Sequence, residues 1–457
     1  KRMTERQNDT HILLGGNTAK VLLLYITPIA FSLFLQSLYG ITDLWIVARY
    51  CQSESILAVS SAAQVTSFFT MAITGMTAGA AVLMAGSGES GRADQTAAAG
   101  MRLLVILGVF LGLLMYLGAG RIAEWMQMPE GAAQEMGRYL RGCSLGMLFT
   151  AVYQMVNAIY KSAGRSKISL LFAAFSGTVN LFGDLLLVGQ WGMGAAGAGA
   201  ATMAAQGLCA VLALVYLRKS PVFFLKKTAN FSGGHRLFSS AKKGWDKTAE
   251  IIRLSSPIIL NSLLTGISIL IVTSMINSAG IVEAAGVGIA EKMFAFFVLV
   301  PTAFQEGLGT YTAIHLAAGR RSQAVKGLWT AFACSFVFCG LISLVTFFRG
   351  RELAGLFQAD PTVLTAAAAY LRGDSLEYVF LALMYCLQGY LNGLGKTGFV
   401  MVSALVTAFL VRIPLIFWLC CAEQISAEAI GWGMSFSAAV GSLLCLAYYW
   451  RNEKRQK

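Results

Sequence analysis

The chain contains 457 residues, of which 56% are hydrophobic and only 12% are charged. Soluble globular domains carry about 25% charged residues, so this composition excludes a protein that faces water on all sides and places the chain in a lipid bilayer. The net charge of +13 does not indicate a nucleic-acid partner, because the basic residues lie in short segments between apolar runs. The nine cysteines are scattered, so neither a disulfide framework nor a zinc site is predicted.

The apolar runs are long and nearly unbroken, as from Val21 to Leu44 and from Trp329 to Phe348. A helix crosses the hydrocarbon core with about 20 mostly apolar residues, whereas the strands of a barrel alternate apolar and polar residues. The sequence therefore predicts an all-α polytopic membrane protein. About twelve transmembrane helices are expected, with approximate cores at 20–48, 56–84, 97–118, 137–160, 168–188, 195–217, 251–279, 284–316, 324–348, 363–391, 398–421 and 427–450.

The Lys and Arg residues predict the orientation, because the cytoplasmic segments of membrane proteins are enriched in them. With the N-terminus inside, 25 of them lie in cytoplasmic segments and seven in outer segments. We therefore expect both termini in the cytoplasm, and the compact length is typical of a protein of the bacterial inner membrane. The long basic segment 218–250 is interpreted as a tether on the anionic inner leaflet, with a regulatory site as the alternative.

An internal repeat divides the chain. Tyr139–Leu145 recurs as Tyr370–Leu376 at an offset of 231 residues, and Pro28 recurs as Pro257 at an offset of 229. Each half has an even number of spans and hence the same topology, so a substrate is expected between the halves near the membrane midplane. We expect two pseudo-symmetric six-helix bundles, with an N-terminal lobe at 1–217, a basic cytoplasmic linker at 218–250 and a C-terminal lobe at 251–457.

Polar intramembrane residues that occur in only one half are the better candidates for function, because residues shared by both halves indicate scaffold. Three such residues correspond to aliphatic residues of the other half: Asp43, Asn180 and Asp184. Asn180 and Asp184 lie one helical turn apart and share a helix face. Further polar residues at helical spacing are Ser32, Gln36 and Tyr39 before Asp43 in the first span, and Thr202 and Gln206 in the sixth.

Two carboxylates with amide and hydroxyl oxygens nearby suit a hard cation such as Na⁺. Asp43, Asn180 and Asp184 are the expected ligands if the ion is Na⁺. Two crowded carboxylates could equally exchange protons, so the pattern leaves H⁺ open. In a third interpretation the same residues simply face water near the outer interface.

The C-terminal half carries charged residues of its own inside predicted spans: Glu291, Glu306, Glu377 and Arg412. We consider them possible cavity residues, together with Gln36, Tyr39 and Gln206 of the other half. Arg412 could equally form a structural ion pair with one of the acids. The three histidines lie in unrelated segments, and the stretch that ends in Gly393–Thr397 has Tyr390 where a phosphate-binding loop needs glycine. Neither an enzyme nor a bound cofactor is predicted.

Short segments in a fixed order carry a family resemblance: Thr27-Pro28, Thr42-Asp43, Ala48-Arg49, Gly164-Arg165-Ser166-Lys167, and Asn180–Asp184 followed by a Gly/Ala-rich span. The Pro257 segment and Ala318-Gly319-Arg320 are their counterparts in the second half. From about Ala19 to Trp450 the chain resembles the multidrug and toxic compound extrusion (MATE) family.

The resemblance implies an exporter that exchanges Na⁺ or H⁺ for a small organic, often cationic, compound. By this resemblance, Glu377 corresponds to an acid that some subfamilies carry in the tenth span. Two departures are that Ala48 precedes Arg49 where the family usually has Gly, and that the seventh span lacks an acid found in some members, with Thr265 nearby. The ion site that the resemblance implies is formed by Asp43, Asn157, Asn180, Asp184 and Thr202.

We therefore expect a secondary active exporter of organic cations that works as a monomer by rocking of two lobes. The alternative is a lipid-linked saccharide flippase of the same superfamily. Such a flippase should line its cavity with Arg or Lys, whereas the intramembrane charges here are mostly acidic. A membrane enzyme acting on lipids, or a receptor without transport activity, finds no support in the motifs.

Overall fold

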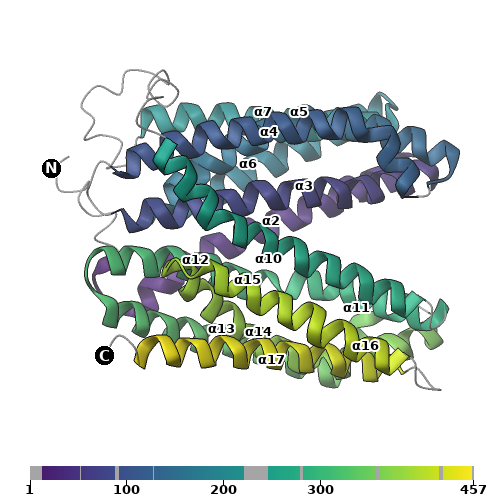
Figure 1. The fold of residues 1–457 in the computed structure, drawn as a ribbon. Helices are drawn as coiled ribbons and strands as arrows, with labels where there is room; N and C mark the ends of the chain where they lie inside the picture. Colours follow the sequence, from purple (N-terminus) through teal and green to yellow (C-terminus); the bar gives the residue numbers. More distant parts are fainter. Residues whose placement is uncertain are drawn as a thin grey trace. The chain divides into compact units, whose positions relative to one another are not determined.

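A computed structural model describes residues 13–51, 53–87, 92–126, 128–220, 245–277, 281–356, 360–420 and 426–454. All secondary structure in these ranges is helical (Figure 1). The first half contains α2 (Thr18–Tyr50), α3 (Ser53–Gly86), α4 (Arg92–Trp125), α5 (Glu130–Ser162), α6 (Lys167–Asp184), the π-helical segment η1 (Leu185–Gln190) and α7 (Gly194–Lys219). The second half contains α10 (Trp245–Asn277), α11 (Ile281–Phe297), α12 (Leu299–Ala317), α13 (Arg321–Ala354), α14 (Pro361–Gly393), α15 (Thr397–Leu405), the π-helical segment η2 (Val406–Arg412), α16 (Ile413–Cys420) and α17 (Ala427–Lys454).

The predicted all-α fold is confirmed, because these helices follow the predicted spans in order. Three of the described spans are composite, and two of them change their helix geometry next to a proline. α11 gives way to α12 just before Pro301, and η2 ends just before Pro414. Proline has no backbone N–H and its ring crowds the carbonyl one turn earlier, so regular α-helical bonding fails at both positions.

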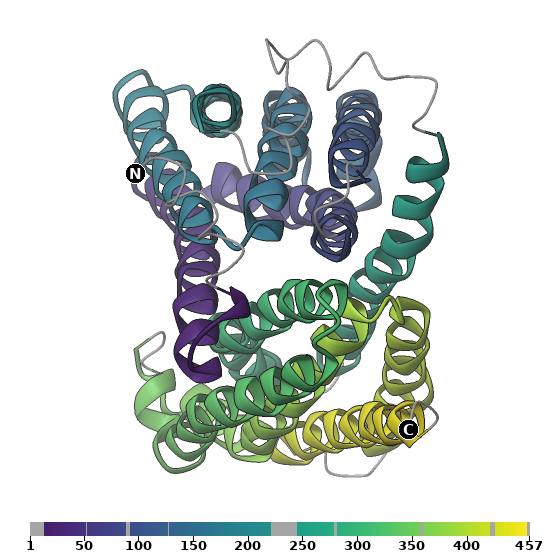
Figure 2. The same ribbon diagram turned by 90° about the vertical axis from the view of Figure 1, so that its left-hand side faces the viewer.

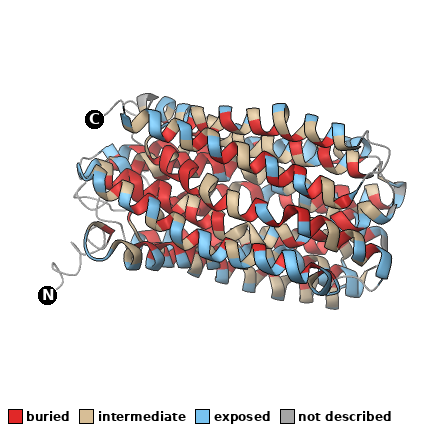
Figure 3. Cartoon of the chain, turned by 90° about the horizontal axis from the view of Figure 1, so that it is seen from below, coloured by how far each residue is buried: buried red, intermediate tan, exposed pale blue. Residues whose placement is uncertain are grey.

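One helix differs from the rest in composition. Eleven helical segments among the described residues are long and apolar enough to cross a membrane, and α14 is not among them. Polar residues, Asp374 and Glu377 included, interrupt its apolar sequence. α14 packs against α11, α12, α13 and α17, and both acids are buried within the protein. Figure 3 shows that buried residues recur along the helices of the described chain. Neighbouring helices therefore shelter these acids from lipid.

The contacts divide the chain into two compact units. The first unit comprises Lys1–Leu14 and Thr27–Ile259, and the second comprises Gly15–Ile26 and Leu260–Lys457. The first turns of α2 thus belong with the second unit, and the first turns of α10 belong with the first. The predicted lobe boundaries near 217 and 251 stay a prediction, because residues 221–244 of the linker lie outside the described ranges.

Both units contain the same close helix pair, which gives the sequence repeat a physical form. α5 packs extensively on α7 in the first unit, as α14 does on α17 in the second (Figure 2). A Cβ atom on Gly199 of α7 would lie 2.7 Å from the Tyr139 carbonyl oxygen, and one on Gly431 of α17 would lie 2.4 Å from that of Tyr370. Only glycine allows these backbones to approach so closely.

Candidate ion-binding site

The candidate site begins with a carboxylate near the C-terminal end of α2. Asp43 is buried with an exposed fraction of 3%, and the Tyr139 hydroxyl of α5 donates a hydrogen bond of 3.1 Å to its Oδ2 atom. The phenol therefore fixes one oxygen of the carboxylate. The other oxygen, Oδ1, is buried and has no hydrogen-bond partner among the described residues.

α6 and α7 complete the group of side chains around Asp43. Asp184 of α6 is fully buried and lies next to Asp43. Asn180 lies one helical turn before Asp184 on the same helix and is its second polar neighbour. Thr202 of α7 lies beside Tyr139. A Cβ atom on Gly183 of α6 would lie only 3.0 Å from the Ala201 side chain of α7, so a glycine at this point brings the two polar faces together.

The oxygens of this group lack partners to an unusual degree. Buried atoms without a hydrogen bond among the described residues include Asp43 Oδ1, both carboxylate oxygens of Asp184, both amide atoms of Asn180, Thr202 Oγ1 and Tyr39 OH. Each such group costs about 1–3 kcal/mol when left unpaired. Two adjacent carboxylates with amide and hydroxyl oxygens are a donor set that a small monovalent cation or protons would satisfy. The cation or proton site that the sequence pattern predicts at these residues stays a prediction.

Asn157 belongs to a second polar group, on the same unit. It accepts a short hydrogen bond from Ser169 of α6 and donates one of 3.4 Å to Gln154. The chain of contacts continues to α2, since Ser32 donates to the Ser169 carbonyl at 3.3 Å and Gln36 donates to the Ser32 hydroxyl at 3.2 Å. The structure thus joins Asn157 to Gln36 and not to the hydrogen bond that holds Asp43.

Two further candidates of the first unit, Tyr39 and Gln206, lie next to Thr202 of this group. Gln206 follows Thr202 by one turn of α7, and its Oε1 atom is buried without a hydrogen-bond partner among the described residues.

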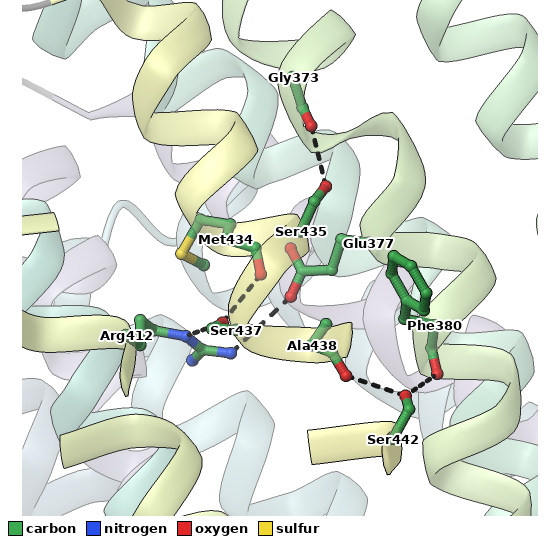
Figure 4. A network of polar contacts seen from close by, with 9 residues as sticks. All are labelled: Gly373, Glu377, Phe380, Arg412, Met434, Ser435, Ser437, Ala438 and Ser442. Atoms are coloured by element: carbon green, nitrogen blue, oxygen red, sulfur yellow. Dashed lines mark hydrogen bonds and ion pairs between the residues drawn. The ribbon is translucent and has the colours of Figure 1, made fainter. Parts of the chain in front are cut away.

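The second unit has a separate charged network. The Arg412 guanidinium lies 3.8 Å from Glu377 Oε1, and its Nε atom donates a hydrogen bond of 3.2 Å to Ser437 Oγ (Figure 4). Glu291 of α11 lies close enough to interact electrostatically with Glu377 and Arg412. Glu306 of α12 instead lies near Tyr25, in the part of α2 that belongs to this unit.

Two neighbours of the candidate acids were absent from the sequence-based candidates: Asp374, beside Glu377, and Tyr139, which holds Asp43. Asp374 corresponds to Cys143 of the first repeat, so the one-half-only criterion would have found it. Tyr139 corresponds to Tyr370, so the same criterion assigns it to the scaffold. A residue shared by both halves can therefore still bind a residue that is not shared.

Long apolar helices that pack around sheltered acids define the chain as an integral membrane protein with polar groups of a kind that usually serve function. The chain belongs to the MatE family, whose model matches residues 28–186 and 257–418. The two matched segments begin at Pro28 and Pro257, the residues paired by the internal repeat.

Individual proteins show the same relationship. The chain is 24% identical to "Probable multidrug resistance protein YpnP" of Bacillus subtilis over 443 residues, which covers 95% of each chain. It is 20% identical to "Probable multidrug resistance protein YoeA" of the same organism, over 93% of this chain and 92% of the other. Its fold matches that of a multidrug resistance MATE family transporter of the MOP superfamily, solved in an outward-facing conformation, with a TM-score of 0.88, 16% identity and coverage of 98% of both chains.

Proposed function

We propose that the protein is a secondary active exporter that exchanges small organic cations for Na⁺ or H⁺ by alternating access of its two halves. The names of its relatives, multidrug resistance proteins, support export of small organic compounds. They favour this function over the flippase alternative. The observation that carries the ion coupling is the buried pair Asp43 and Asp184 with unpartnered oxygens.

Coupling follows from the cost of buried charge. Two adjacent carboxylates in a protein interior repel each other and lack water, so the conformation that buries them is favoured when a cation or protons neutralise them. For Na⁺, the ligands would be oxygens of Asp43, Asn180 and Asp184. For H⁺, the same two carboxyl groups would each hold a proton. Tyr139 would orient Asp43 in both cases.

The same acids would attract a cationic substrate in the step of the transport cycle in which the coupling ion is absent. When the ion leaves, the acidic residues attract a positively charged compound, and the returning ion weakens that attraction. Polar residues around the acids would contact the substrate; the candidates are Gln36, Tyr39, Gln206, Glu291 and Glu306. Glu377 and Arg412, which the sequence also offered as cavity residues, lie opposite each other as an ion pair and are not included. We place the exporter in a bacterial inner membrane as a monomer, with both termini in the cytoplasm.

Transport in proteoliposomes tests this function. The purified full chain is reconstituted, vesicles are loaded with ethidium as a fluorescent organic cation, and an inward Na⁺ gradient or an inward H⁺ gradient is imposed separately. We expect efflux driven by one of the two gradients, and that gradient identifies the coupling ion. Efflux that responds to neither gradient, from protein that is correctly folded, would contradict the proposal.

A further inference from the structure

The charged network of the second unit lies at the place in the repeat where the first unit has its candidate ion site. By chain order and repeat offset, α14, η2 and α17 are the counterparts of α5, α6 and α7. Asp374 of α14 corresponds to Cys143 of α5, which lies beside Asp43. The two clusters therefore occupy equivalent positions in two copies of one scaffold.

The two clusters distribute charge differently over equivalent helices. In the first unit, α6 contributes an acid, Asp184, and no basic side chain among the site residues accompanies it. In the second unit, the acids Asp374 and Glu377 lie on α14, and η2 contributes the positively charged Arg412. The helix that supplies an anion in one unit thus supplies a cation in the other.

Arg412 is held in place by two contacts inside the protein. The exposed fraction of the Arg412 side chain is 8%, and that of Glu377 is 2%. Ser437 of α17 accepts a hydrogen bond from the Nε atom, and Glu377 lies opposite the terminal nitrogen, as Figure 4 shows. Burying a guanidinium is costly unless it neutralises an acid, so the nearby Glu377 carboxylate explains why Arg412 can lie inside the protein.

The charge of the two buried acids of α14 can be balanced without any further ion, and the third acid of the network, Glu291 of α11, is only partly buried. Asp374 and Glu377 adjoin each other, and Asp374 Oδ1 and Glu377 Oε2 have no hydrogen-bond partner among the described residues. One proton shared between the two carboxyl groups would satisfy both oxygens and leave a single negative charge. Arg412 supplies the matching positive charge.

We propose that Arg412 is a resident cation of the second unit. Its guanidinium takes the place that an exchangeable ion takes in the first unit, and it thereby confines ion coupling to the site around Asp43 and Asp184. Arg412 is then a specificity-determining residue, because it sets how many ions are exchanged and where. This inference rests on the proposed ion-coupled function.

The test measures binding of radioactive Na⁺ to the purified full chain at neutral pH, in a background in which Asp43→Asn and Asp184→Asn remove the first site. This background should bind no Na⁺. Adding Arg412→Gln leaves buried acids without their cation, so we expect about one Na⁺ per chain to bind. Adding Glu377→Gln as well should abolish that binding. Lys292→Gln is the matched control, because it removes an exposed cation of the same unit and should create no site.

Two outcomes would overturn the inference. One is Na⁺ binding in the background that still contains Arg412, which would show an exchangeable site in the second unit. The other is no Na⁺ binding by a folded Arg412→Gln variant. If that variant does not fold, Ser437→Ala releases the guanidinium, so weak Na⁺ binding is expected and its absence counts against the inference. The parent chain tests the proposed function separately, since the second-unit variants are measured without the first site.

Discussion

At the scale of single residues, Tyr139 is the protein side chain that fixes Asp43. Its hydroxyl donates to Oδ2 at 3.1 Å, and the opposite carboxylate oxygen stays free for an ion. Hydrogen bonds to charged groups contribute about 1.5–3 kcal/mol. Tyr139 is therefore a positioning residue: it orients the carboxylate and contributes no charge of its own.

Tyr139→Phe should weaken gradient-driven efflux about tenfold, because it removes one hydrogen bond to a charged group. The affinity for the coupling ion should fall with it, and the ion concentration needed for half-maximal efflux gives that affinity. Tyr370→Phe is the matched control, since it removes the equivalent phenol of the other half. Equal effects of the two substitutions would argue against a specific role for Tyr139.

Asp360 provides a residue-scale prediction outside the membrane-spanning helices. It caps α14, and hydrogen bonds from Thr362 hold the pKa of its carboxyl below the usual range. A folded-state pKa below the unfolded one stabilises the protein above the unfolded pKa, and this contribution is lost as pH falls through the folded pKa. Asp360→Ala should therefore lower the thermal midpoint at neutral pH, and the difference should shrink on acidification. A difference that is constant from pH about 7 to pH about 3 would contradict this assignment.

The sequence alone predicts the candidate acids but not their hydrogen-bond partners. Asp43, Asn180 and Asp184 stand out because a charge in a membrane needs a reason and because the other half lacks them. Asn157, suggested by family resemblance, lies in a different hydrogen-bonded group with Ser169. Which polar groups meet depends on helix rotation and on the approach of neighbouring helices, and spacing along one chain does not determine either.

At the scale of helices, glycine contacts control the geometry of the site. Gly199 lets α7 approach α5 at Tyr139, the residue that holds Asp43. The Gly- and Ala-rich run at the start of α7 indicates that this helix packs closely on a neighbouring helix, and the structure identifies that neighbour as α5. The positions of the π-helical segments were not predictable in the same way, since η1 contains no proline.

Gly199→Ala should destabilise the protein by about 1–3 kcal/mol, because its methyl group would press on the backbone of α5. It should also reduce efflux, since it displaces Tyr139 from Asp43. Thermal melting and transport of the purified variant measure the two effects. Gly177→Ala is the control, because a Cβ atom at Gly177 meets nothing within 4 Å and alanine favours the helix. Similar losses in both variants would show that the close contact of Gly199 with α5 does not decide the result.

At the scale of the whole molecule, the repeat is the main organising feature. It predicted two halves of the same topology, the structure shows the same close helix pair in both units, and the family match begins at its two prolines. The contacts between residues add a detail that hydropathy does not show. The beginning of α2 belongs with the second unit, and the beginning of α10 belongs with the first. Hydropathy reports only whether a helix can lie in lipid, and it does not report which neighbours the helix contacts.

The orientation is testable by labelling from one side of the membrane. The distribution of Lys and Arg predicts that segment 218–250 faces the cytoplasm and that Ser426, just before α17, faces outward. In intact spheroplasts, a membrane-impermeant maleimide should label Ser426→Cys above the background of the parent. Ser239→Cys should be labelled only after permeabilisation. The reverse pattern would mean that the chain is inserted with the opposite orientation.

Ion coupling should depend on the acids of the first unit and not on those of the second. Gradient-driven ethidium efflux from proteoliposomes containing Asp43→Asn, Asp184→Asn or Glu377→Gln, with equal amounts of folded protein in each, tests this dependence. We expect both first-unit variants to lose gradient-driven efflux and Glu377→Gln to retain it. Loss of coupling only in Glu377→Gln, with efflux intact in the other two, would show that the coupling site lies in the second unit instead.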